Sequence, residues 1–247
     1  MSGHSKWSTI KRKKGKTDAQ RAKVFTKIGR EIIVCVKEGG PDPVNNSRLR
    51  DLIAKAKSNN VPNENIDRVI KKAAGDTERN NFETVVYEGY GPNGVAVIVE
   101  CLTDNRNRTA GDIRHYFDKH GGNMGTTGCV AFMFELKGII ILDNNKLDED
   151  KVMEDCVEVG ASDFSFEDDT VEVTTDPTQV SAIRELFEAK GYSLLSAQSE
   201  QIPSTYVNLD DEDTIIKMNR LLDALEDNDD VQNVWHNWEN VSSSDDE

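Results

Sequence analysis

The residues best suited to chemistry in this sequence are the cations near its start. The first thirty positions hold ten lysines and arginines, and Asp18 is the single acidic residue among them. Basic side chains that contact phosphates displace condensed counterions, which gives salt-sensitive and largely sequence-independent binding to nucleic acid. The pattern therefore predicts a phosphate-binding segment. The expected contacts are Lys6, Lys11, Arg12, Lys13, Lys14, Lys16, Lys23, Lys27 and Arg30.

An aromatic residue, Trp7, lies inside this basic segment. Aromatic rings stack on unpaired bases, so Trp7 could add a base contact to the phosphate contacts. The alternative for the segment is a solubilising tail or an acid-poor targeting sequence. Because the positive charge continues onto a predicted helix, where Lys23, Lys27 and Arg30 share one face, we favour nucleic-acid contact.

A second candidate site is the segment 103–109, which reads Thr-Asp-Asn-Arg-Asn-Arg-Thr. Its two arginines, Arg106 and Arg108, would stand at a helix N-terminus, where the backbone already attracts anions. They could hold an anion or a phosphate of a nucleic-acid backbone. The alternative is an ordinary helix cap whose arginines pair with nearby carboxylates. Both interpretations fit the sequence equally well.

No constellation of residues typical of an enzyme is visible in the sequence. Of the four histidines, His115 and His120 are five residues apart, so on a helix they would point about 140° apart and would not share a metal. The chain has no phosphate-loop, zinc-protease or nucleophile-elbow motif. The sequence therefore predicts no catalytic residue, no metal and no cofactor.

The cysteines and the hydropathy point to a cytoplasmic protein. The four cysteines lie far apart, without a Cys-x-x-Cys pair, which predicts buried thiols in a reducing compartment. No apolar run approaches the roughly 20 residues needed to cross a bilayer, so no membrane segment is expected.

The charge is distributed very unevenly along the chain. The net charge is −15, but residues 1–79 carry +10 and the remainder carries −25. This asymmetry predicts a basic module for polyanions attached to an acidic body. The acidic body would repel nucleic acid, so nucleic-acid contact should be confined to the front of the chain. It could instead attract a basic protein partner.

Hydrophobic periodicity indicates the elements that would position these residues. A period of 3.6 predicts short amphipathic helices at 17–37, 46–57 and 62–75. Beyond about residue 81 a period of two appears, broken by further helical stretches. The predicted strands are 85–90, 95–102, 129–136, 139–142, 164–166, 171–174, 193–197, 201–207 and 231–235. The predicted helices among them are 106–120, 148–159, 178–190 and 211–226.

The order of these elements predicts an α+β fold with one domain inserted in another. Residues 138–199 follow the strand-helix-strand-strand-helix-strand order of a ferredoxin-like sandwich. The elements on either side would complete a second sheet. The expected domains are a basic three-helix nucleic-acid-binding domain at 1–79, a discontinuous middle α/β domain at 80–137 plus 200–240, the inserted domain at 138–199, and an acidic tail at 241–247.

Several short motifs resemble those of the YebC/PmpR family. The run Gly3-His4-Ser5-Lys6-Trp7 and the segment 18–27 resemble the opening of that family, and residues 87–92, 103–109 and 121–123 resemble its later signatures. The resemblance covers essentially the whole chain. It implies a helical N-terminal domain, two α/β domains, one inserted in the other, and no catalytic residues. The family start falls at Gly3, so no transit peptide is expected.

The sequence departs from the family pattern in small ways. Ala22 stands where a glycine is frequent, and Cys129 stands where a serine is usual. Neither position strongly affects a proposed nucleic-acid contact.

The resemblance implies a regulator of gene expression, with alternatives. Bacterial members are generally described as DNA-binding transcriptional regulators of the cytoplasm. Mitochondrial relatives are translational activators, and some bacterial members are associated with the ribosome and with relief of stalled elongation. The first expectation is therefore a non-enzymatic DNA-binding regulator. The alternatives are a translation factor that contacts ribosomal RNA and an acidic scaffold that recruits a basic protein. The sequence specifies no oligomeric state.

Overall fold

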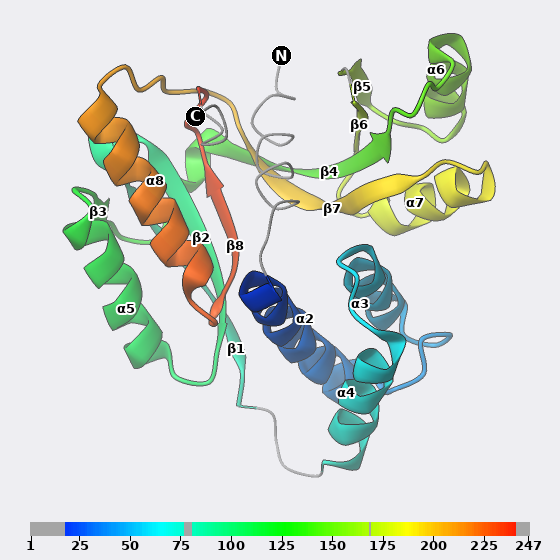
Figure 1. The fold of residues 1–247 in the computed structure, drawn as a ribbon, viewed down its shortest axis with the longest axis horizontal. Helices are drawn as coiled ribbons and strands as arrows, with labels where there is room; N and C mark the ends of the chain where they lie inside the picture. Colours follow the sequence, from blue (N-terminus) through cyan, green and yellow to red (C-terminus); the bar gives the residue numbers. More distant parts are fainter. Residues whose placement is uncertain (1–17, 77–80, 168, 241–247) are drawn as a thin grey trace. The chain divides into compact units, whose positions relative to one another are not determined.

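The protein is described here by a computed structural model that covers residues 18–76, 81–167 and 169–240 (Figure 1). Three N-terminal helices are followed by two four-stranded antiparallel sheets with helices, which confirms the predicted α+β class. The described residues form two compact units. One comprises Phe134–Ser204, and the other comprises the remaining described residues.

The N-terminal helices pack around one small apolar core. They are α2 (Asp18–Gly39), α3 (Ser47–Ser58) and α4 (Asn63–Gly75). As predicted, the apolar face of α2 is buried, with Ile32 and Cys35 against Leu49 of α3 and Ile66 of α4. The Asn46 side chain caps α3 by accepting the Leu49 backbone N–H at 3.0 Å.

The start of α4 differs from the prediction by one residue. We predict Pro62 as the first helical residue, but it is the N-cap, because its ψ of 137° is extended. Its carbonyl accepts the Ile66 N–H at 3.2 Å, as an N-cap carbonyl does.

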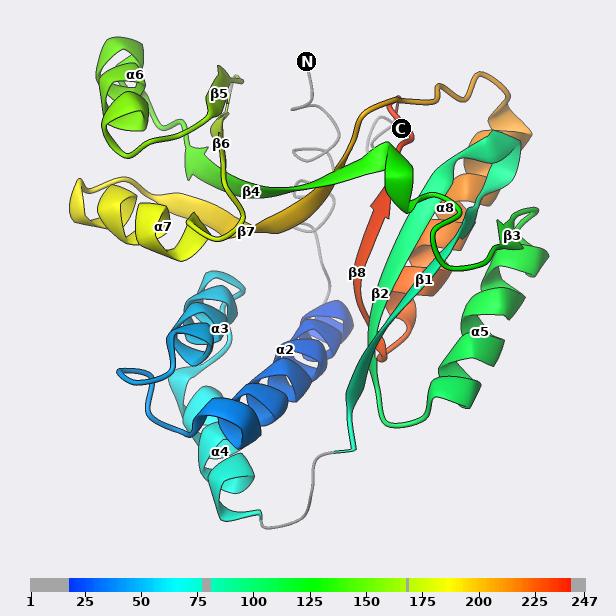
Figure 2. The same ribbon diagram turned by 180° about the vertical axis from the view of Figure 1, so that it is seen from behind.

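The first sheet belongs to the same compact unit as the three helices. Its strands, in spatial order, are β3 (Asn123–Met124), β1 (Glu83–Tyr90), β2 (Ala96–Thr103) and β8 (Val231–His236). The 3₁₀ turn η1 (Pro92–Gly94) joins β1 to β2. Helices α5 (Arg106–Lys119) and α8 (Glu212–Asp227) lie side by side on one face of the sheet (Figures 1 and 2). Between the helices and the sheet lies a core that includes Val97, Ile113, Phe117, Leu222 and Trp238.

The second sheet forms the other compact unit. Its strands, in spatial order, are β5 (Asp163–Phe166), β6 (Thr170–Thr175), β4 (Phe134–Asp143) and β7 (Leu194–Pro203). Two helices, α6 (Glu149–Glu158) and α7 (Val180–Ala189), complete it. Every neighbouring strand pair is antiparallel, and the chain order β4-α6-β5-β6-α7-β7 is the predicted ferredoxin-like order.

At two places the sequence predicts a break between strands where the structure has one continuous strand. The first of these is β4. The predicted strands 129–136 and 139–142 are replaced by the single strand β4, while residues 131–133 form the 3₁₀ turn η2 (Ala131–Met133). Gly138 does not interrupt β4. A Cβ at Gly138 would lie 2.5 Å from Cγ2 of Val180, so glycine is required there by close packing against α7.

The second case is β7. The predicted strands 193–197 and 201–207 are replaced by one continuous strand. The polar run that suggested a break stays in the ladder, because Ser199 pairs with Gly138 and Glu200 pairs with Lys137 on β4. Backbone pairing with a long neighbour outweighs the weak strand preference of these polar residues.

A buried carboxylate fixes the loop that leads into β4. Glu88 of β1 is 4% exposed and accepts three backbone N–H groups, from Gly128 at 2.7 Å, Val130 at 2.9 Å and Ala131 at 2.8 Å. Burial alone would raise the pKa of the Glu88 carboxyl, but these three hydrogen bonds outweigh it and lower the pKa.

Replacing Glu88 by glutamine should lower the free energy of unfolding by about 2 kcal/mol, because a neutral amide replaces the anionic acceptor. Urea denaturation followed by circular dichroism would measure the change. Glu83→Gln on the same strand is the control, since Glu83 is exposed. Equal midpoints for the two variants would show that the three hydrogen bonds add nothing to stability.

The structure also shows which cysteines are buried. Cys35, Cys101 and Cys156 are buried free thiols, and Cys129 is half-buried. Burial raises the pKa of Cys101 to about 12.

Within the described ranges, no three His, Cys, Asp or Glu side chains gather as ligands for a metal ion. None of the helices in the described part of the chain is both long enough and apolar enough to span a bilayer.

Candidate nucleic-acid interface

The predicted phosphate contacts divide into two groups. The contacts outside the described residues are Lys6, Trp7, Lys11, Arg12, Lys13, Lys14 and Lys16. The other three, Lys23, Lys27 and Arg30, lie along one side of α2 at spacings of four and three residues. We call these three residues the α2 cations.

The α2 cations contact the segment that links α8 to β8. This segment, residues 226–230, reads Glu-Asp-Asn-Asp-Asp, and we call it the acidic loop. Lys23 Nζ forms an ion pair with the Asp227 carboxylate. Lys27 Nζ donates a hydrogen bond to the Glu226 backbone carbonyl at 2.6 Å.

Arg30 makes the most extensive contact with the acidic loop. Its guanidinium donates to the Asp229 backbone carbonyl at 2.9 Å and to Asp230 Oδ1 at 2.7 Å. It also lies over the Phe82 ring, 5.6 Å from the ring centroid. Contacts to carboxylate and carbonyl oxygens therefore engage all three α2 cations.

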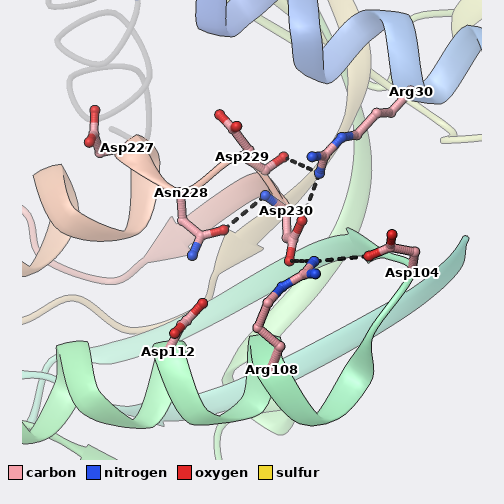
Figure 3. Close-up of a pocket in the computed structure, with 8 residues that line it drawn as sticks. All are labelled: Arg30, Asp104, Arg108, Asp112, Asp227, Asn228, Asp229 and Asp230. Carbon is pink, nitrogen blue, oxygen red and sulfur yellow. Dashed lines mark hydrogen bonds and ion pairs between the residues drawn. The ribbon is translucent and has the colours of Figure 1, made fainter.

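Asp230 is the centre of this network, and Figure 3 shows its two arginine partners. Besides Arg30, its carboxylate accepts from Arg108 at 2.8 Å and from the Thr109 and Thr103 hydroxyls at 2.7 and 3.2 Å. Burial alone would raise the pKa of the Asp230 carboxyl, but the hydrogen bonds from Arg108, Thr109 and Arg30 lower it to about 2. Asp230 is thus a buried anion that joins α2 to the start of α5.

The segment 103–109 caps α5, and its two arginines differ in their surroundings. The Asn105 side chain accepts the Arg108 N–H at 3.1 Å, which is the geometry of an N-cap. The Arg108 guanidinium pairs with Asp104 at 2.9 Å and with Asp230, so an anion at Arg108 would have to displace a carboxylate. The Arg106 side chain is exposed and makes no ion pair with any residue that the structure describes.

An open pocket of about 390 Å³ lies beside this network (Figure 3). Five of its lining residues are aspartates, and its two guanidiniums already bind carboxylates. The pocket lining is Arg30, Asp104, Arg108, Asp112, Asp227, Asn228, Asp229 and Asp230. Such an acidic lining repels a phosphate as long as Arg30 and Arg108 stay paired with its aspartates.

Comparison with known families covers nearly all of the described chain. A model of the TACO1/YebC protein N-terminal domain matches residues 5–76, and a model of the TACO1/YebC second and third domain matches residues 82–238. The chain belongs to the TACO1/YebC family. This confirms the resemblance stated from the sequence motifs.

Two relatives of this chain in the TACO1/YebC family are described as transcriptional regulators. A protein of Acetivibrio thermocellus is 59% identical over 239 residues, covering 96% of this chain and 99% of the relative. One of Ruminiclostridium cellulolyticum is 54% identical over 248 residues, covering both chains fully. Both carry the description "probable transcriptional regulatory protein". A crystal structure of a conserved hypothetical protein from Aquifex aeolicus matches with a TM-score of 0.81 at 47% identity, over 91% of this chain and 92% of that one.

The helical domain of this TACO1/YebC chain carries further cations that the sequence reasoning did not include as contacts. Lys57 of α3 and Lys71 and Lys72 of α4 are exposed. No ion pair engages them within the part of the chain that the structure describes. The sequence signal for them is their position outside the apolar stripe of each helix, which predicts exposure without distinguishing a binding residue from a solvated one.

Proposed function

We propose that the chain is a nucleic-acid-binding regulator of transcription whose N-terminal segment and helical domain contact phosphates. The observation that carries this proposal is the segregation of charge, +10 in residues 1–79 against −25 in the rest. The names of the relatives from Acetivibrio thermocellus and Ruminiclostridium cellulolyticum support it, because both are described as probable transcriptional regulatory proteins.

The proposed contact is electrostatic and mainly independent of sequence. Six cations at Lys6, Lys11, Arg12, Lys13, Lys14 and Lys16 would each neutralise a phosphate and release counterions. Six such contacts correspond to a slope of about −5 in a plot of log affinity against log salt concentration. The exposed Lys57, Lys71 and Lys72 would add to the slope. The proposal includes no catalytic step and no cofactor, and it places the protein in the cytoplasm.

A second candidate is a translation factor that binds ribosomal RNA. The observation that favours it is the net charge of −25 on residues 80–247, which would be repelled along a duplex but would suit a surface rich in basic ribosomal proteins. A third candidate, an acidic scaffold for a basic protein, uses the same charge without requiring the N-terminal contact.

A competition experiment separates these functions. Fluorescence anisotropy would follow the full chain bound to a labelled promoter duplex over a salt series, with unlabelled random duplex or purified ribosomes as competitor. We expect the promoter complex to survive at physiological salt and random duplex to compete poorly, because a transcriptional regulator must contact base edges in addition to its sequence-independent phosphate contacts. If ribosomes displace the DNA at a far lower concentration of sites, the translation function replaces the transcriptional one. If no nucleic acid binds, the scaffold function remains.

A further inference from the structure

We propose that the acidic loop is an intramolecular competitor for nucleic acid, which occupies Lys23 and Lys27 of the α2 cations until phosphates displace it from these two lysines. This inference rests on the proposed function and specifies how the same binding surface is regulated. It is carried by four contacts that three neighbouring cations make. Lys23 contacts Asp227, and Lys27 contacts Glu226. Arg30 contacts both Asp229 and Asp230.

The acidic loop offers the α2 cations the same chemistry that a phosphate backbone would offer. The helical rise places Lys23 and Lys27 about 6 Å apart along α2, and Lys27 and Arg30 about 4.5 Å apart. Each of them donates to an oxygen atom, and two of those oxygens belong to carboxylates. Charge-assisted bonds of this kind are also those that phosphate oxygens accept from lysine and arginine.

The contacts differ in how easily they can be broken. The Lys23–Asp227 pair is exposed, with side-chain exposures of 38% and 68%, so it adds at most about 1 kcal/mol. The oxygen that Lys27 contacts at 2.6 Å belongs to an uncharged backbone carbonyl, and a phosphate oxygen is a stronger acceptor. The Lys23–Asp227 pair can therefore be broken at little expense, and Lys27 gains a stronger acceptor when a phosphate oxygen replaces the carbonyl.

Arg30 differs from the two lysines because Asp230 is held from several sides. The side-chain exposures of Arg30 and Asp230 are 22% and 6%, and Arg108 and Thr109 bind the same carboxylate. We therefore expect Arg30 to stay paired while Lys23 and Lys27 leave the acidic loop. The two lysines and the first residues of the acidic loop form the exchangeable part of the contact, and the Arg30–Asp230 pair fixes its position.

The affinity test compares Asp227→Asn with a variant of equal charge change elsewhere. Asp227 lies at the exposed end of α8, so its replacement should leave the fold intact. Glu154→Gln on α6 is the matched control, because it also removes one negative charge at an exposed position of the other compact unit. Asp227→Asn should bind labelled duplex or single strands about threefold to fivefold more tightly than the unaltered chain, while Glu154→Gln should change the affinity less than about twofold.

The second measurement reports the contact itself. A water-soluble carbodiimide joins a lysine amine to a carboxylate with which it is in contact, and mass spectrometry of the digested chain quantifies the product. The Lys23–Asp227 cross-link should form in the free protein and decline when nucleic acid saturates it. The internal control is the Lys190–Glu158 pair, at 2.8 Å in the other unit, whose cross-link should be unchanged.

The outcomes distinguish this inference from the proposed function. If the chain binds nucleic acid but the Lys23–Asp227 cross-link stays constant and Asp227→Asn binds no more tightly, the inference is overturned and the proposed function stands. If Asp227→Asn binds while the unaltered chain does not, the inference is supported in a stronger form. If neither binds, the proposed function fails, and the inference fails with it.

Discussion

Replacing Lys11, Arg12, Lys13 and Lys14 by glutamine should weaken binding to nucleic acid on the order of 100-fold at low salt. Each lost phosphate contact also removes the release of counterions that drives binding. The slope of log affinity against log salt concentration should therefore become shallower by about 3 to 4. Anisotropy titrations of the full chain over a salt series would measure both quantities.

The control for this variant removes the same charge outside the helical domain. Arg114, Lys119, Lys146 and Lys151 are exposed, and all four can be changed to glutamine together. The control should keep both the affinity and the salt slope nearly unchanged. A similar loss in both variants would mean that net charge alone governs binding and that residues 11–14 form no specific contact. A pure scaffold would keep its partner binding in both variants.

Replacing Asp230 by alanine should be the most destabilising of these substitutions, with a loss of about 3 kcal/mol in the free energy of unfolding. The side chain is 6% exposed, and its removal deprives Arg30, Arg108 and the Thr109 hydroxyl of a shared anion. This loss of free energy lies at the lower end of the range for breaking a buried ion pair, because Arg108 is 47% exposed. Denaturation followed by tryptophan fluorescence would report this region, since Trp238 lies in the adjacent core.

The same carboxylate predicts an acid dependence of stability. The pKa of Asp230 is lowered from 3.8 to about 2, so the folded state favours its charged form. The charged Asp230 carboxylate contributes about 2 kcal/mol to the free energy of unfolding. This contribution is fully present above pH 4 and is lost as the pH falls towards 2.

Asp230→Asn should remove this part of the pH dependence. Asp104→Asn is the control, because Asp104 also pairs with Arg108 but is half exposed. Identical acid profiles for the unaltered chain and Asp230→Asn would show that Asp230 does not stabilise the fold through its charge.

Much of the fold can be predicted from periodicity, because each helix buries a recognisable apolar face. Ile32 on α2 and Phe117 on α5 are buried where the 3.6-residue period expects them. Strand boundaries are harder, because a ladder partner decides them. Gly138 and Ser199 look like breaks in isolation, yet they pair with each other in the middle of two long strands.

The candidate interface is less predictable than the fold for a related reason. A lysine that binds phosphate and a lysine that binds aspartate are the same in sequence, and Lys23 is separated from Asp227 by 204 positions. The run 226–230 is visibly acidic, but nothing local indicates that it meets α2. Likewise, Arg108 could be recognised as part of a cap, whereas its buried partner Asp230 comes from a distant strand end.

The pairing of β4 with β7 makes the inserted unit a removable module. Phe134 and Pro203 are direct partners in the ladder, so the chain enters and leaves this unit at neighbouring points of a two-stranded stem. The first sheet consists of β3, β1, β2 and β8, and none of these strands lies between Phe134 and Pro203 in the sequence. The first sheet therefore takes none of its strands from the inserted unit. A short hairpin turn could therefore close the stem in place of the whole module. Such an architecture allows the ferredoxin-like part to be exchanged, shortened or lost while the first sheet keeps its register.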